Sequence, residues 1–283
     1  MAKFDIAQEL MSASDYLEER DQLFVSFWGL TGLGKTWLAC TFPKPIYLLS
    51  LDMKGPHGVV KRMVKRKLIK PNDIMITEAM KACFGDKIPI APDYEDTQEL
   101  WGYTKDWVDG ITKAYGDSGG TVVIDTASSM WETCDTAISE PIRLRLERTK
   151  KDWQRWDYQH ANRGMKGPLE KVTATSLNLV VVSHAKEAYN AKGQPTGKFL
   201  YRGFKQIPEL ADIHFRIGVE KLGRGEKMTN DDRYILVEKC REDDKLLGAK
   251  LYDPTYEDIA DLLSGELEPD EYNEEVIEDE DDE

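Results

Sequence analysis

Residues 24–36 read FVSFWGLTGLGKT, and this stretch decides the fold. Its first half is a run of apolar and β-favouring residues, which predicts a buried strand. Its second half, Gly29-Leu30-Thr31-Gly32-Leu33-Gly34-Lys35-Thr36, matches the pattern G-x-x-x-x-G-K-[ST] at every position. A helix is expected to follow, so the stretch has the strand–loop–helix context of a phosphate-binding loop (P-loop).

The residue types in this loop suit a triphosphate. Glycines let the backbone curl until successive N–H groups point at phosphate oxygens. The helix that follows adds its positive N-terminal end. We expect the loop to bind ATP, with Lys35 bridging the β- and γ-phosphates and Thr36 ligating Mg²⁺. The alternative, a glycine turn with a chance lysine, is disfavoured by the flanking strand and helix.

Three further polar residues follow apolar runs. VVID (122–125) ends in Asp125, which we expect to complete the Mg²⁺ shell. LLSLD (48–52) ends in Asp52, our candidate for orienting the attacking water, and LVVVSH (179–184) ends in His184, which could report nucleotide state. Parallel strands bring such residues to one sheet edge. Turn acids, helix caps and a backbone-bonded histidine are the ordinary alternatives.

The remaining pattern favours an α/β fold. Continuously apolar strands separated by helices predict a mostly parallel sheet covered on both faces. The expected strands are 23–28, 45–51, 121–124, 177–182, 213–219 and 233–238. The expected helices are 56–70, 94–116, 129–175 with a break near 164–168, and 254–263.

Charge and composition divide the chain into three parts. We expect an N-terminal helix at 1–20, one α/β ATPase domain at 21–264 and a disordered acidic tail at 265–283. The tail carries twelve Asp and Glu residues, and removing them leaves a net charge of −2 out of −14. The tail could aid solubility, compete with DNA or recruit a replication or recombination partner.

The sequence also predicts a cytoplasmic protein without a membrane segment. No run of about 18 apolar residues occurs, and the acidic residues 1–20 do not resemble a signal peptide. The four cysteines are far apart, which disfavours disulfides and a zinc site.

Taken together, these stretches resemble the RecA-like ATPase core, a P-loop NTPase fold with a mostly parallel central sheet flanked by helices. More narrowly, they resemble the phage-encoded RecA-like P-loop ATPases of DNA recombination and single-strand annealing. The matching stretches are GLTGLGKT (29–36), LLSLD (48–52), VVIDT (122–126), YQHANRGMKG (158–167) and LVVVSHAKE (179–187).

The resemblance implies further roles. Asp52 falls where RecA-like proteins usually carry a water-activating Glu, and His184 falls at the nucleotide sensor. Lys239 and Arg241 resemble the basic pair that reaches a neighbouring subunit's γ-phosphate, although a solvated pair at a strand end is the alternative. ATP would then lie between subunits, so a homo-oligomeric ring or filament is expected.

The resemblance also implies that a mobile loop at 186–206 contacts single-stranded DNA. Its cations would neutralise phosphates and its aromatic rings would stack on bases. The expected contacts are Lys186, Lys192, Lys198, Phe199, Tyr201, Arg202 and Lys205. The alternative is a solvated surface with its aromatic rings turned into the core. The basic stretch 61–67 is expected to be an exposed helix face or a subunit contact.

We therefore expect an ATP-binding and ATP-hydrolysing protein that acts on single-stranded DNA in recombination, repair or annealing. Three alternatives stay open: a P-loop small-molecule kinase, a non-catalytic ATP-dependent switch that recruits replication partners, and a small packaging motor without a nuclease.

Overall fold

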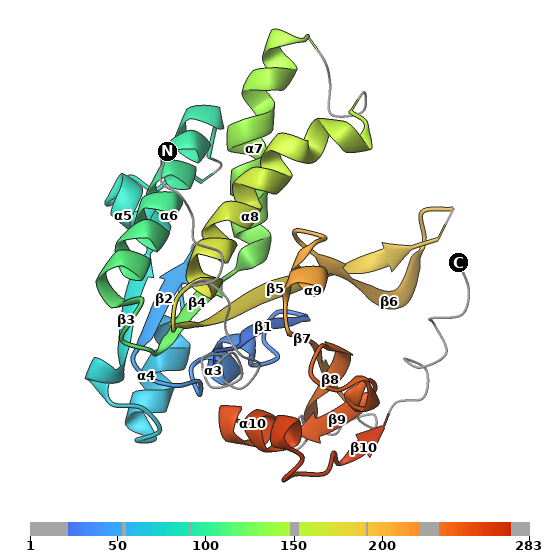
Figure 1. The fold of residues 1–283 in the computed structure, drawn as a ribbon. Coiled ribbons are helices and arrows are strands. Elements are labelled where there is room, and N and C mark those ends of the chain that lie inside the picture. The colour runs from blue at the N-terminus through green and yellow to red at the C-terminus, as the bar shows by residue number, and fades with distance from the viewer. Residues whose placement is uncertain are drawn as a thin grey trace, which may run out of the picture.

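A computed structural model describes residues 22–52, 55–90, 92–147, 153–190, 192–220 and 232–272. Within these residues one ten-stranded sheet runs through the molecule (Figure 1). Its strands are β1 (Phe24–Gly29), β2 (Ile46–Ser50), β3 (Ile74–Glu78), β4 (Thr121–Asp125), β5 (Asn178–Tyr189), β6 (Pro195–Arg202), β7 (Ile213–Val219), β8 (Arg233–Cys240), β9 (Ala249–Tyr252) and β10 (Glu271–Tyr272).

The strand order is β10-β9-β8-β7-β1-β5-β4-β2-β3, and β6 pairs with β5 alone. The strands from β7 to β3 in this order are all parallel, whereas β6, β8, β9 and β10 pair antiparallel. The predicted α/β fold with a mostly parallel sheet is therefore confirmed. The loop after β1 and the ends of β2, β4 and β5 meet at the carboxyl edge of the sheet.

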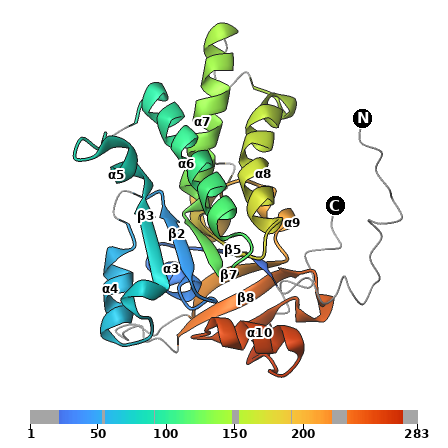
Figure 2. The same cartoon turned by 60° about the vertical axis from the view of Figure 1, so that its left-hand side comes forward.

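Helices cover the sheet on both sides. Figure 2 shows α6, α7 and α8 together on one side and α10 on the other. The helices are α3 (Lys35–Ala39), α4 (His57–Lys65), α5 (Ala79–Phe84), α6 (Tyr94–Tyr115), α7 (Ala127–Arg145), α8 (Gln159–Thr173), α9 (Ile207–Leu210) and α10 (Tyr256–Ser264). Short 3₁₀ helices occur at Pro71–Asp73, Arg155–Tyr158 and Asp244–Leu246.

Two hydrophobic cores explain why the strands are continuously apolar. Within β1, Val25 and Phe27 pack into the core under α3, α4 and α10, whereas Phe24 packs into the core under α6, α7 and α8. Phe27 stacks on Phe215 with ring centroids 5.4 Å apart. Complete burial of such a side chain contributes roughly 1.5–3 kcal/mol. Successive residues of each central strand therefore pack into the cores on opposite faces of the sheet, so both faces need apolar side chains.

One predicted break lies in the wrong place. The stretch 129–175 is interrupted between α7 and α8, and α8 continues through Gly164 and Pro168. Gly164 serves close helix packing, because an added Cβ would lie 2.3 Å from Cδ1 of Ile138 on α7. Pro168 removes one N–H donor and its ring crowds the carbonyl of Gly164, yet α8 continues past it to Thr173.

The segment 186–206 is not a loop but the arm of a β-hairpin. β5 runs on to Tyr189, and β6 returns beside it to Arg202. Figure 1 shows this arm projecting away from the body of the molecule. The sequence does not predict these strands because, in the outer part of the arm, both faces are mostly exposed to solvent. The segment therefore lacks the alternation of apolar and polar residues that indicates a strand, and it is rich in glycine and lysine instead.

The ends of the chain differ from the predicted boundaries. The predicted helix at 1–20 and residues 273–283 of the acidic tail lie outside the described residues. The start of that tail is described, and Glu271–Tyr272 forms β10 against β9. The folded part therefore extends beyond residue 264. Among the described residues, no helix combines the length and apolar character needed to cross a bilayer.

Candidate functional site

The P-loop joins β1 to α3, and its backbone adopts conformations and close approaches that only glycine permits. Gly34, directly before α3, has φ +89°, a conformation in which residues with side chains are strained. At Gly29 an added Cβ would lie 2.6 Å from the carbonyl oxygen of Ile217 on β7. These two glycines are therefore required by geometry, independently of any ligand.

Lys35 lies inside the loop that precedes it. The side chain is buried, with 5% of the residue exposed, and Nζ donates to the carbonyl oxygens of Gly29 at 2.9 Å and Leu30 at 2.6 Å. Burial lowers the pKa of Lys35 to about 8, although Asp125 and Asp52 act in the opposite direction. The ammonium group is held by carbonyls that a phosphate oxygen would replace.

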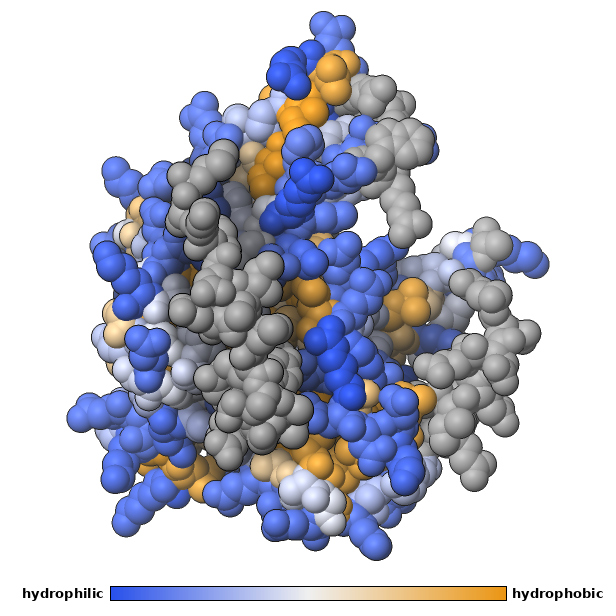
Figure 3. Space-filling view, viewed as in Figure 1, coloured by the Kyte–Doolittle hydropathy of each residue, from blue (hydrophilic) through white to orange (hydrophobic). Residues whose placement is uncertain are grey.

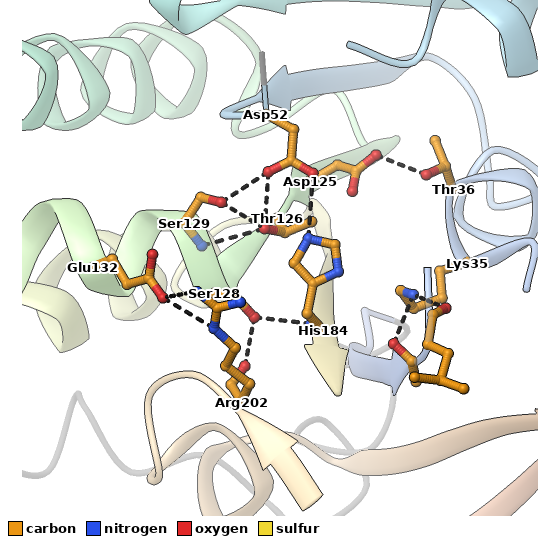
Figure 4. Close-up of polar contacts among 12 residues, drawn as sticks. Lys35, Thr36, Asp52, Asp125, Thr126, Ser128, Ser129, Glu132, His184 and Arg202 are labelled. Carbon is orange, nitrogen blue, oxygen red and sulfur yellow. Dashed lines mark hydrogen bonds and ion pairs between the residues drawn. The ribbon is translucent and has the colours of Figure 1, made fainter. Parts of the chain in front are cut away.

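Thr36 and Asp125 meet across the sheet edge. The Thr36 hydroxyl donates to Oδ2 of Asp125 at 2.7 Å (Figure 4). Asp125 is 8% exposed, and burial and the charge of Asp52 raise its pKa, against the opposing effects of Thr36 and Lys35. A buried carboxylate beside a hydroxyl is a donor set that suits Mg²⁺.

The surroundings set how such an ion would be held. No cluster of three or more His, Cys, Asp or Glu side chains suited to a metal occurs in the described part of the chain. Mg²⁺ would therefore take its other ligands from water and nucleotide phosphates, as it usually does in phosphoryl-transfer sites.

Asp52 follows β2 and is surrounded by donors. Its Oδ1 accepts from Ser129 Oγ at 2.8 Å and from Thr126 Oγ1 at 3.4 Å, and Oδ2 lies 3.3 Å from Nε2 of His184. Burial raises the pKa of Asp52, but these three groups outweigh burial and hold the pKa below its ordinary value. Asp52 is therefore ionised at neutral pH and well fixed.

His184 points into the same group of residues. It lies on β5, and its backbone N–H donates to Ser128 Oγ at 2.8 Å. Its Nδ1 is buried and has no hydrogen-bond partner among the described residues. The preceding Ser183 lies elsewhere, with its hydroxyl 3.2 Å from the hydroxyl of Tyr201. His184, the expected sensor, lines the pocket, whereas Ser183 does not.

A pocket of about 580 Å³ joins these residues. Its lining contains Lys35, Thr36, Asp52, Asp125 and His184, which the sequence predicts to lie together. It also contains residues to which the sequence pattern gives no role at this site, namely Trp37, Arg62, Arg66 and Arg233.

The cations of the basic stretch 61–67 are exposed, as predicted, and two of its arginines also line the pocket. Arg62 and Arg66 on and just after α4 line the pocket, and the Arg66 guanidinium lies 5.5 Å from the ring centre of Trp37. Their four-residue spacing puts both on one helix side. That spacing, on a helix directly after the Asp52 strand, is the signal in the sequence that points to the pocket.

Lys239 and Arg241 lie at the opposite edge of the sheet. β8 is antiparallel, so its end at Cys240 lies beside Ile213, where β7 begins. Lys239 Nζ donates to three backbone carbonyls of the segment 208–211, at 2.7–2.8 Å. Arg241 pairs with Asp212 at 3.3 Å. Both cations contact this edge within their own chain, and the expected role of Lys239 and Arg241 towards a neighbouring subunit's γ-phosphate stays a prediction.

The predicted DNA contacts divide between the two faces of the hairpin. Residues paired across antiparallel strands share a face. His184 pairs with Arg202 and Lys186 with Leu200, whereas Glu187 pairs with Phe199. Alternation along β6 places Lys198 with Leu200 and Arg202, so these cations share the face of His184. The rings of Phe199 and Tyr201 lie on the other face.

Tyr201 is not available for stacking on a base. Its ring packs against Trp28 and His214, with centroids 6.2 Å and 5.6 Å apart, and burial raises the pKa of its hydroxyl. Phe199 is 40% exposed, and Leu200 beside it is also exposed. Figure 3 shows an apolar patch on this projecting arm. The tyrosine assignment is therefore corrected, and Phe199 is the accessible ring.

The remaining cations of the set are accessible. Lys186, Lys192, Lys198 and Lys205 are all exposed. Arg202 is held in place, because its Nε and Nη2 donate to Oε1 of Glu132 at 3.0 Å and 2.5 Å (Figure 4). Its own carbonyl accepts from Ser128 Oγ at 2.5 Å. The base of the hairpin is thus tied to α7, the helix that follows Asp125.

Comparisons with known proteins identify a family. The sequence model of a family described as "AAA domain" matches residues 22–240. None of the curated proteins matches the chain significantly. Among solved structures the chain is similar to one described as an "ATPase Domain", with 14% sequence identity, 78% of each chain covered and a TM-score of 0.42.

Proposed function

Because this chain belongs to the AAA domain family, we propose that it binds and hydrolyses ATP and acts on single-stranded DNA. One observation carries the nucleotide part of the proposal. The P-loop lysine, the Thr36–Asp125 pair, Asp52 and His184 all line one pocket at the carboxyl edge of the sheet. This is where open α/β sheets bind their ligands.

The residues divide the work of hydrolysis between them. Backbone N–H groups of the P-loop and Lys35 bind the phosphates, while Thr36 and Asp125 hold the metal ion. Mg²⁺, when bound, neutralises charge on the β- and γ-phosphate oxygens. Asp52 orients the water that attacks the γ-phosphorus, as the β–γ bridging P–O bond breaks and yields ADP and phosphate. His184, bonded to Asp52, contacts the γ-phosphate as the sensor.

The contacts of Asp52 favour slow hydrolysis. Ser129, Thr126 and His184 already occupy its oxygens, and a carboxylate with a depressed pKa is a weak proton acceptor. The second candidate function, a switch that binds ATP tightly and hydrolyses it rarely, rests on this observation. In both cases the nucleotide state would be passed to the hairpin.

The hairpin is the proposed DNA contact. It carries exposed lysines on the face of His184 and an accessible phenylalanine on the other face. Phosphate neutralisation would dominate such binding and make it strongly salt-dependent. We propose a role in recombination, repair or annealing, with the chain assembled into a ring or filament. The acidic tail would recruit a protein partner.

The hydrolysis test compares Lys35→Ala with Lys113→Ala, a substitution of an exposed lysine at the end of α6. Phosphate release is measured with and without a single-stranded oligonucleotide. We expect turnover to be lost only in Lys35→Ala. Equal turnover in both variants would remove the nucleotide assignment. Tight ATP binding with a turnover near background in the unmodified protein would favour the switch.

The DNA test uses the hairpin lysines. Lys186→Glu combined with Lys198→Glu is expected to weaken oligonucleotide binding and to lower the slope of log K against log salt by about 0.7 for each phosphate that the variant no longer neutralises. The control is Lys105→Glu with Lys113→Glu on α6, where both lysines are exposed. An equal weakening in both double variants would show a general charge effect and remove the hairpin assignment.

A further inference from the structure

Arg233 reaches the P-loop from a strand that carries no nucleotide motif. It is the first residue of β8 and pairs with Val219, the last residue of β7. Because β8 runs antiparallel to β7, its beginning lies at the edge where the parallel strands end. Arg233 is therefore at the nucleotide edge, on the flank opposite to the strands that carry Asp52 and Asp125.

Its guanidinium lies directly on the loop. A Cβ added to Gly34 would be 2.5 Å from Nη1 of Arg233, so the guanidinium lies directly against the loop. Arg233 lines the same pocket as Lys35 and Thr36.

Asp253 forms an ion pair with the Arg233 side chain, but this pair does not use all of the hydrogen-bond donors of the guanidinium. Nη2 donates to Oδ1 of Asp253 at 2.7 Å, and the side chain is 16% exposed. Nε is buried and has no partner among the described residues. A guanidinium has five N–H donors, and leaving a buried one unpaired is costly. Asp253 fixes the orientation and leaves donors for a further acceptor.

The charges around the loop supply the reason for a second cation. On one flank lie two carboxylates, Asp52 and Asp125, which would repel an anionic phosphate. A guanidinium remains charged at every physiological pH.

From these observations we propose that Arg233 binds phosphate oxygens of the nucleotide held by its own P-loop, and that Asp253 is its positioning residue. The ligand class is a polyphosphate, and the proposal rests on the proposed nucleotide site. The alternative, that Arg233 only joins β8 to the loop before α10, leaves the unpaired Nε and the position in the pocket unexplained.

The experiment measures the dissociation constants of ATP and of inorganic tripolyphosphate by calorimetry. Tripolyphosphate carries the phosphate chain without base or ribose. Arg233→Gln is compared with Arg163→Gln, an exposed arginine on α8 away from the pocket. We expect Arg233→Gln to weaken both ligands by the same factor, roughly 10- to 100-fold, the worth of one or more charge-assisted hydrogen bonds.

Further variants separate binding from folding. Arg233→Lys keeps the positive charge but cannot donate two parallel hydrogen bonds as the guanidinium does. We therefore expect it to weaken the binding of both ligands less than Arg233→Gln does. Asp253→Asn frees the guanidinium, and we expect it to weaken both ligands less than Arg233→Gln. Thermal unfolding without nucleotide establishes that each variant is folded. If Arg233→Gln is unfolded, the lysine variant decides the question.

Two results would overturn the proposal. Tripolyphosphate affinity could be unchanged in the folded Arg233 variants, or Arg163→Gln could lose as much affinity as Arg233→Gln. Failure of the proposed function gives a different result, because the unmodified protein itself would then bind neither ATP nor tripolyphosphate.

Discussion

Ser128 is the residue whose replacement tests the link between the nucleotide edge and the hairpin. It lies in the first turn of α7 and is 1% exposed. Its hydroxyl accepts from the His184 N–H at 2.8 Å and donates to the Arg202 carbonyl at 2.5 Å. One oxygen atom therefore joins β5, β6 and the helix after Asp125. Ser128→Ala removes both bonds and leaves the backbone otherwise unchanged.

The magnitude follows from the two groups that lose a partner. A buried backbone N–H or C=O left unsatisfied costs about 1–3 kcal/mol. Both hydrogen bonds are only partly buried, so water can replace some of what is lost. We therefore take the lower end for each group and expect a total loss of about 2 kcal/mol in the free energy of unfolding.

Urea denaturation measures this loss, and native-state hydrogen exchange locates it. The control is Ser118→Ala, which changes an exposed serine in the turn after α6. A local loss of about 2 kcal/mol should speed exchange of the His184 amide roughly 30-fold. A loss below about 0.5 kcal/mol, with unchanged exchange at His184, would refute the reasoning that the hydroxyl holds the two strands to α7.

Three further changes have expected outcomes. Asp52→Asn should lower ATP turnover about 100-fold or more while the ATP dissociation constant changes little, measured by phosphate release and calorimetry. ATP affinity should fall about tenfold between pH 7 and pH 9, because the Lys35 ammonium is present below its pKa of about 8 and is lost above it; Arg233 should keep binding measurable at pH 9. Gly164→Ala should destabilise the fold by about 1–3 kcal/mol in thermal unfolding, and Ile138→Val, which removes the clashing Cδ1, should restore part of the loss.

The sequence predicts well whatever depends on residues close together along the chain. The P-loop pattern, the strand before it and the acid that ends β4 are local features with a physical reason for each residue. The parallel order of the sheet follows from buried strands separated by helices. These features bring Lys35, Thr36, Asp52, Asp125 and His184 to one edge, and all five line the pocket.

Strand direction limits the rest. A run such as 233–240 predicts a strand, but nothing in its own residues says whether it runs parallel to its neighbour. In the antiparallel arrangement, Arg233 comes to the nucleotide edge and Lys239 goes to the far edge. The cation of this strand that lies at the chain's own nucleotide edge is therefore Arg233, which the sequence pattern does not single out.

Prediction from the sequence also fails for exposed polar strands and for contacts between helices. In the outer part of the arm made by β5 and β6, side chains on both faces are mostly exposed, so the period-two pattern there carries little hydrophobic signal. The Gly164–Pro168 pair indicates a helix break by propensity, but the contact of Gly164 with Ile138 overrides propensity. Such contacts join residues far apart in sequence and are visible only in three dimensions.

The alternation of side chains along β6 has a consequence for any bound strand of nucleic acid. Lysines point to one side of the arm and Phe199 to the other, so a single strand lying along the lysine side would be gripped by its sugar–phosphate chain alone. Its nucleobases would face outward, unstacked from any protein ring and open to Watson–Crick pairing. A complementary strand could then join it without first displacing the protein.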